Sequence, residues 1–146
     1  MEPARSIGLL GGGQLALMMA REAERLGIAL HVQTPDPDDP ATRLATSVVV
    51  GDLNDARATR DLAARAARIS FENEWVSIAD LQRLEQDGIN FLPPLSALEP
   101  LLDKRSQRRL LNQLHLPTPH WAGLEAALPP APAPSDQAEG EVYAPL

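Results

Sequence analysis

Short apolar runs alternate along the chain with longer segments in which apolar residues recur every three or four positions. The apolar runs predict strands at 5–10, 28–32, 47–50, 69–71 and 89–92. The periodic segments predict helices at 15–26, 54–67 (with Asn54 as the cap), 77–88 and 103–114. Regular alternation of strands and helices through short connections indicates an α/β fold. We therefore expect a Rossmann-like parallel sheet with helices on both faces.

The last part of the chain differs in composition from the rest. Five prolines fall between Pro129 and Pro145, among alanines and acidic residues. Such a segment has too little apolar surface to offset the entropy that it would lose on ordering. The sequence therefore predicts one Rossmann-like domain over 1–123 and a disordered tail over 124–146.

Composition limits the classes of function. The 146 residues carry a formal net charge of −7, which argues against nucleic-acid binding. Because the chain has no cysteine, it has no disulfide, thiolate metal site or cysteine nucleophile. No apolar run approaches the ~20 residues that span a bilayer, and no signal peptide precedes the first strand. We therefore expect a cytoplasmic protein without membrane contact. The three histidines show no metal-binding spacing, and we assign them no role: His31, His115 and His120.

A glycine-rich turn between the first strand and the first helix is the strongest local motif. Gly11, Gly13 and Ala16 satisfy the G-x-G-x-x-G/A pattern in the required strand–turn–helix context. Glycines allow the backbone to approach an anion closely, and a helix N-terminus directs N–H groups toward it. The motif predicts phosphate or nucleotide binding, although a tight turn alone also requires glycine.

The acidic residue that a dinucleotide site needs at the end of the second strand is missing. That strand ends in Gln33-Thr34-Pro35, and Asp36 lies within the proline-rich loop that follows. A carboxylate at the strand end would bind a ribose hydroxyl of NAD. The NAD(P)-binding domain of an oxidoreductase is therefore a disfavoured alternative.

Two polar clusters could also contact a ligand. Segment 71–75, Phe-Glu-Asn-Glu-Trp, follows the fourth strand, where carboxylates and an amide suit ribose hydroxyls or an amine. Because side chains alternate along a strand, we expect only one of Glu72 and Glu74 to face the cleft, and we expect Trp75 to pack. The last helix begins with four cations along one side: Lys104, Arg105, Arg108 and Arg109. Cations in the first turn of a helix are destabilised by the helix dipole. We therefore favour the interpretation that they contact an anionic ligand over the interpretation that they only face solvent.

Together these segments resemble the 5-(carboxyamino)imidazole ribonucleotide synthase family, which are ATP-grasp ligases of purine biosynthesis. The resemblance rests on motifs that match in order and spacing, at 7–15, 48–52, 70–76, 103–111 and 114–119. It extends over about residues 5–121. It implies that the chain is the family's N-terminal, Rossmann-like domain, the pre-ATP-grasp domain.

The resemblance also implies a reaction and its ligands. The family carboxylates aminoimidazole ribonucleotide with ATP, Mg²⁺ and bicarbonate, which is activated as carboxyphosphate. Position by position, the resemblance implies that Glu74, with Glu72 or Asn73 near it, faces the ribonucleotide beside a glycine loop of Gly12, Gly13, Gln14 and Leu15. It assigns Lys104 and Arg108 to ATP, at positions where the family usually has arginine and lysine, respectively. It also implies a homodimer.

The resemblance ends before the family's second domain. Residues 122–146 contain no lysine, arginine or glycine loop of an ATP-grasp domain. We therefore expect the chain to be inactive alone, with no catalytic or metal-binding residue and no tightly bound cofactor. We expect only weak binding of the ribonucleotide, through its phosphate end. A non-catalytic nucleotide- or phosphate-binding module is the alternative.

Overall fold

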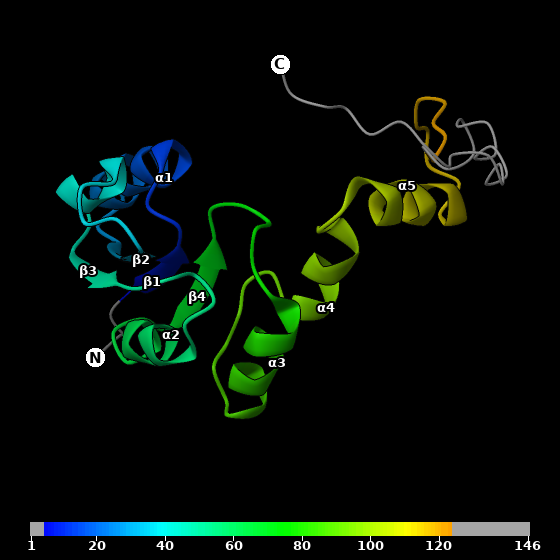
Figure 1. Ribbon diagram of the computed structural model, residues 1–146. Helices are drawn as coiled ribbons and strands as arrows, with labels where there is room; N and C mark the ends of the chain where they lie inside the picture. Colours follow the sequence, from blue (N-terminus) through cyan, green and yellow to red (C-terminus); the bar gives the residue numbers. More distant parts are fainter. Residues whose placement is uncertain (1–4, 124–146) are drawn as a thin grey trace, which may run out of the picture.

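The computed structural model describes residues 5–123, and its centre is a parallel sheet of four strands (Figure 1). The strands are β1 (Ser6–Leu10), β2 (Ala29–Thr34), β3 (Ser47–Val50) and β4 (Arg68–Phe71), in the order β3-β2-β1-β4. The central strand β1 pairs in register with both neighbours, so that Leu10 lies opposite Gln33 on one side and Phe71 on the other. This order brings the carboxyl ends of β1, β2 and β4 to one edge.

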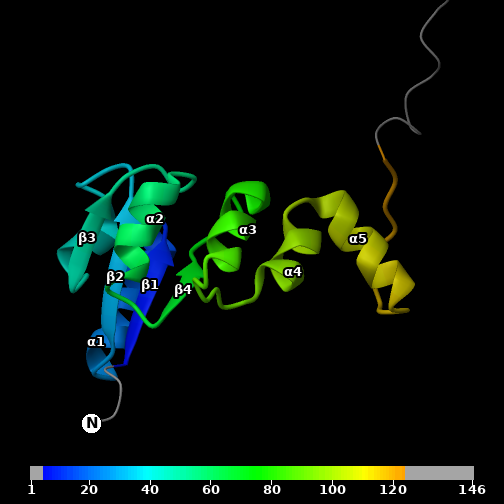
Figure 2. The same cartoon turned by 90° about the horizontal axis from the view of Figure 1, so that it is seen from below.

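Within residues 5–123, five helices and two short 3-10 helices connect and follow the strands. The helices are α1 (Gln14–Arg25), α2 (Ala56–Ala63), α3 (Ile78–Gln86), α4 (Leu95–Leu98) and α5 (Lys104–Gln113), and the 3-10 helices are η1 (Pro40–Arg43) and η2 (Glu99–Leu101). From β4 onward, α3, α4 and α5 follow one another away from the sheet (Figure 2). Among residues 5–123, no helix is long and apolar enough to cross a membrane.

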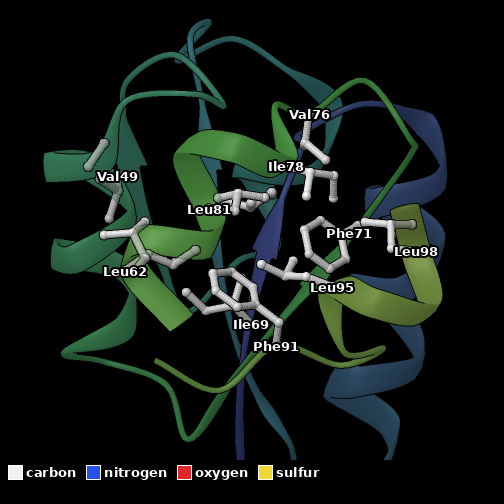
Figure 3. Close-up of a cluster of buried hydrophobic side chains, with 13 residues drawn as sticks. Val49, Leu62, Ile69, Phe71, Val76, Ile78, Leu81, Phe91, Leu95 and Leu98 are labelled. Atoms are coloured by element: carbon white, nitrogen blue, oxygen red, sulfur yellow. The ribbon is translucent and has the colours of Figure 1, made fainter. Parts of the chain in front are cut away.

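The two faces of the sheet bury separate apolar clusters, as the predicted fold requires. On one face, Leu9 and Val32 pack with the buried alanines of α1: Ala16, Ala20 and Ala23. On the other face, Leu10, Ile69 and Phe71 pack against α2, α3 and α4 (Figure 3). In that cluster the rings of Phe71 and Phe91 stack with centroids 5.8 Å apart. Both predictions, a parallel sheet and helices on both of its faces, are confirmed.

Two local predictions were wrong. The predicted fifth strand at 89–92 is reduced to a single bridge between Ile69 and Phe91, because Pro93 and Pro94 have no N–H to extend a ladder. The cap of α2 is Asp55, whose carboxylate accepts from the N–H groups of Arg57 and Ala58. The Oδ1 of Asn54 instead accepts from the Ser77 N–H at 2.7 Å, at the start of α3.

The structure also corrects the predicted extent of α2 and the predicted burial of α5. Helix α2 stops at Ala63 instead of Ala67, because the N–H of Ala67 donates to Ser6 at the start of β1. The predicted helix at 103–114 is observed as α5, but it has no buried residue, and Leu114 on its predicted apolar stripe is 57% exposed. The tail predicted over 124–146 lies outside the described residues.

Candidate functional site

A cavity of about 460 Å³ lies at the carboxyl ends of the strands, where the loops after β1, β2 and β4 meet. Its polar wall consists of the glycine loop 11–13 and the side chains of Thr34, Asp39, Glu72 and Asn73. Its apolar wall consists of Leu15, Pro35, Leu53 and Trp75. This position is the one at which open parallel sheets bind ligands.

The carboxylate of Glu72 occupies the N-terminus of α1. Its Oε2 accepts from the N–H of Gly13 at 2.9 Å, and its Oε1 accepts from the N–H of Ala16 at 3.3 Å. The backbone of Glu72 is fixed as well, because its N–H donates to the Leu10 carbonyl. The N–H groups that were expected to hold a ligand phosphate therefore already hold an anion of the chain itself.

The same carboxylate explains two of the glycines. A Cβ at Gly11 would lie 2.3 Å from Oε2 of Glu72, and a Cβ at Gly13 would lie 2.6 Å from its Oε1. Gly11 also has a φ of +117°, a backbone conformation that residues with a Cβ rarely adopt. The glycines at positions 11 and 13 are therefore needed so that the backbone can lie close to the Glu72 side chain. The motif alone does not reveal this internal contact.

Asp39 brings a second carboxylate to the cavity, and the sequence analysis missed it. Thr34 is buried at the end of β2, and its hydroxyl group donates a hydrogen bond to Oδ2 of Asp39. Gly12 packs against this pair, since a Cβ there would lie 2.8 Å from Asp39 Oδ2 and 2.9 Å from Thr34 Cβ. The only signal in the sequence was the aspartate-rich loop after β2. That this loop folds back to the end of the strand depends on tertiary structure.

The structure separates the residues assigned to the ribonucleotide into two groups. Gly12, Gly13, Leu15, Glu72 and Asn73 line the cavity. Gln14 and Glu74 are exposed and lie outside its lining. One of the two glutamates does face the cleft, and it is Glu72 instead of Glu74. Trp75, which was expected to pack in the interior, lines the cavity and is 79% exposed.

The cavity is negatively charged on its protein side. It contains the carboxylates of Glu72 and Asp39, and no lysine or arginine is among its lining residues. Partners for these carboxylates are donors such as hydroxyl and amine groups. A ligand phosphate would be repelled by both carboxylates.

The two cations assigned to ATP lie on α5, outside the cavity lining. Lys104 is exposed in the first turn, and Arg108 donates from Nη1 to Thr118 Oγ1 at 2.6 Å. The helix is capped by Asp103, and hydrogen bonds from the Ser106 hydroxyl and N–H hold the pKa of this carboxyl below its usual range. Within the described part of the chain, no group of three or more metal-binding side chains occurs.

A second cavity, of about 560 Å³, lies over the opposite ends of the strands. Its exposed surface is mostly apolar, although Arg5, Glu22 and Arg68 are among the residues that line it. Binding sites for small polar ligands need a few convergent polar groups to fix orientation. The cavity beside Glu72 has such groups at the carboxyl ends of the strands, where open parallel sheets bind ligands, and it is therefore the candidate site.

Comparison with known proteins shows the family to which the chain belongs. The family described as ribonucleotide synthetase preATP-grasp domain matches residues 4–100, and the chain belongs to this family. N5-carboxyaminoimidazole ribonucleotide synthase from Synechocystis sp. is 51% identical over 121 residues, which are 83% of this chain and 31% of that protein. The resemblance and the fold that the sequence predicted are both confirmed.

Solved structures give the same result. The N5-carboxyaminoimidazole ribonucleotide synthetase of Thermotoga maritima superimposes with a TM-score of 0.73 at 29% identity, over 84% of this chain and 35% of that one. The Aspergillus clavatus synthase, solved with ADP and 5-aminoimidazole ribonucleotide, gives 0.71 at 28% identity, over 80% of this chain and 31% of that one. The chain thus spans about a third of the length of the relatives that it matches.

Proposed function

We propose that this chain forms part of the substrate site of an N5-carboxyaminoimidazole ribonucleotide synthase, which carboxylates aminoimidazole ribonucleotide with ATP and bicarbonate. The observation that carries the proposal is the cavity at the strand ends, where Glu72 is fixed on the N-terminus of α1. The Aspergillus clavatus relative was solved with this ribonucleotide and ADP. The chain's share of the activity is to hold and orient the substrate.

The charge of the cavity indicates which part of the ribonucleotide it holds. Glu72 and Asp39 can accept hydrogen bonds from ribose hydroxyls and from the exocyclic amine, whereas they would repel the phosphate. The phosphate end therefore points away from this cavity, toward cations elsewhere. This orientation replaces the expectation that the glycine loop binds the phosphate.

Lys104 and Arg108 are the residues of this chain that would contact ATP. Both are cationic and lie on one side of α5, where phosphate oxygens could accept their hydrogen bonds. Arg108 would exchange its hydrogen bond with Thr118 for one with the nucleotide. ATP supplies the phosphoryl group that activates bicarbonate. The described residues do not fit Mg²⁺, because they hold no cluster of metal ligands, and we assign no step to a metal on this chain.

The test is a titration of the 146-residue chain followed by its backbone amide signals. Aminoimidazole ribonucleotide should shift the signals of Gly12, Gly13, Leu15, Glu72 and Asn73 with an affinity in the millimolar range. Gly13→Val should abolish these shifts, because the new side chain would displace the Glu72 carboxylate. Arg60→Ala is the control, since Arg60 pairs with Asp87 on the surface between α2 and α3.

Two ligands distinguish the alternatives in the same experiment. NAD should cause weaker shifts than the ribonucleotide, and a stronger response to NAD near Thr34 would favour a dinucleotide-binding domain. Failure of the ribonucleotide to shift any signal at the cavity would overturn the proposal. The homodimer and the cytoplasmic location belong to the same proposal, and light scattering and cell fractionation test them.

A further inference from the structure

We infer that Trp75 is a positioning residue, on which the flat heterocyclic ring of the substrate stacks at the mouth of the cavity. The inference rests on the proposed function, because it assigns one part of the same ligand to one side chain. The resemblance and the motifs gave this residue no role. Its position and exposure in the folded chain carry the argument.

The exposure of Trp75 requires an explanation. Its side chain is 79% exposed and belongs to neither of the two buried clusters, yet it lines the cavity. An indole ring that remains in water gives up the large hydrophobic gain that burial of an aromatic side chain provides. Leu15, which is 55% exposed, lines the same cavity. Exposed apolar surface beside a concave site is typical of a surface that a ligand covers.

The loop that carries Trp75 is fixed on both sides. On the N-terminal side, Glu72 is bound to α1 through Gly13 and Ala16. On the C-terminal side, Val76 is buried in the cluster of Figure 3 and its N–H donates to the Glu74 carbonyl. Between them, the N–H of Trp75 donates to Asn73 Oδ1 at 2.9 Å. The backbone thus holds the Cα of Trp75 at the rim before any ligand binds, so that a stacked complex has to order only the two side-chain torsions of the indole.

The two walls of the cavity match the two kinds of surface on a ribonucleotide. The carboxylates of Glu72 and Asp39 suit its hydroxyl and amine groups, and the apolar wall suits the faces of its aromatic ring. Stacking on an aromatic side chain depends little on which ring is bound. Trp75 therefore contributes affinity and ring orientation, while the carboxylates distinguish one ring substituent from another.

The experiment compares two ligands that differ by the ring. Aminoimidazole ribonucleotide carries it, and ribose 5-phosphate lacks it. In a Trp121→Phe background Trp75 is the only tryptophan of the chain, and its fluorescence should change with the ribonucleotide but not with ribose 5-phosphate. In titrations followed by amide signals, Trp75→Ala should weaken binding of the ribonucleotide by about five-fold or more and leave ribose 5-phosphate unaffected. Trp75→Phe should restore most of the loss.

Leu26→Ala is the matched control, because Leu26 is 54% exposed just after the end of α1 and lies outside this cavity. Equal ribonucleotide affinity of the parent chain and Trp75→Ala would overturn this inference but not the proposed function. Equal weakening of both ligands would also overturn it, since a general loop defect would then explain the effect. If the parent chain binds neither ligand, the proposed function fails and the stacking role fails with it.

Discussion

Glu72 and Gly13 are 59 positions apart in the chain, and the carboxylate of the first accepts a 2.9 Å hydrogen bond from the backbone N–H of the second. This contact joins the end of β4 to the start of α1. It also places the negative charge of the cavity where a helix N-terminus stabilises it. One side chain thereby contributes to both the stability of the fold and the character of the site.

The first prediction concerns the stability that this contact supplies. Glu72→Ala should lower the free energy of unfolding by about 2 kcal/mol, because hydrogen bonds to a charged acceptor are stronger than neutral ones. Glu72→Gln should lose less, since its amide oxygen can still accept one bond. Urea denaturation measures both values. Glu74→Gln is the control, as Glu74 is exposed, and its value should stay within about 0.5 kcal/mol of the parent.

The second prediction separates backbone strain from the clash at the glycine loop. Gly11 and Gly27 both have positive φ, but a Cβ at Gly27 meets nothing within 4 Å, whereas one at Gly11 meets Glu72. Gly27→Ala should therefore lower the free energy of unfolding by about 1 kcal/mol, through conformational strain alone. Gly11→Ala should lower it by at least about 2 kcal/mol more, because the added Cβ also clashes with Glu72. In a Glu72→Gly background, which also removes the Glu72 Cβ that would lie 2.6 Å from the added Cβ, this difference should shrink. An unchanged difference there would contradict the assigned clash.

The third prediction distinguishes the roles of two neighbouring polar residues. Asp55→Ala should remove the cap of α2 and destabilise the domain by about 1 kcal/mol, with faster amide exchange in α2. Asn54→Ala should instead expose the N–H of Ser77 and speed exchange at the start of α3. Amide hydrogen exchange measures both effects. Asn112→Ala on the exposed surface of α5 should change neither helix.

The fourth prediction concerns pH. Partial burial, followed by the charge of Arg65, lowers the pKa of His31 from its ordinary value of about 6.5. The unfolded chain therefore binds more protons than the folded chain just below that value, and stability falls as the pH is lowered through this window. His31→Gln should flatten the pH dependence of the unfolding free energy between pH 7 and 5.

Arg65→Gln should flatten this dependence only in part, because burial is the larger cause of the shift. Arg43→Gln, an exposed cation on η1, should leave the slope as it is. A slope that persists without His31 would assign the pH effect to other groups.

The periodicity of apolar residues was sufficient to predict the sheet and the helices that cover it. Burial of Leu9 on one face and Leu10 on the other follows directly from alternation along β1. The cap of α2 was placed wrongly because one of the two candidate residues has its partner far along the chain. Asn54 and Asp55 are both good caps, and only the position of Ser77 decides which of them caps α2.

The candidate site shows the same division. Its location follows from the glycine loop and the strand ends, which are local features. Its charge does not, because Glu72 reaches α1 and Asp39 returns to Thr34 only in the folded chain. The exposure of Trp75 likewise depends on the folded loop, in which the neighbouring Val76 is buried and Trp75 is left at the surface.

The order β3-β2-β1-β4 also has a consequence for synthesis of the chain on the ribosome. The central strand β1 emerges first, but its second neighbour, β4, ends only at Phe71. At about 5–20 residues per second, several seconds pass between the emergence of β2 and that of β4. During this interval one edge of β1 has no partner, and a free strand edge can pair with another chain. Slow codons between β2 and β4 would therefore lengthen the period in which the nascent chain is most prone to aggregate.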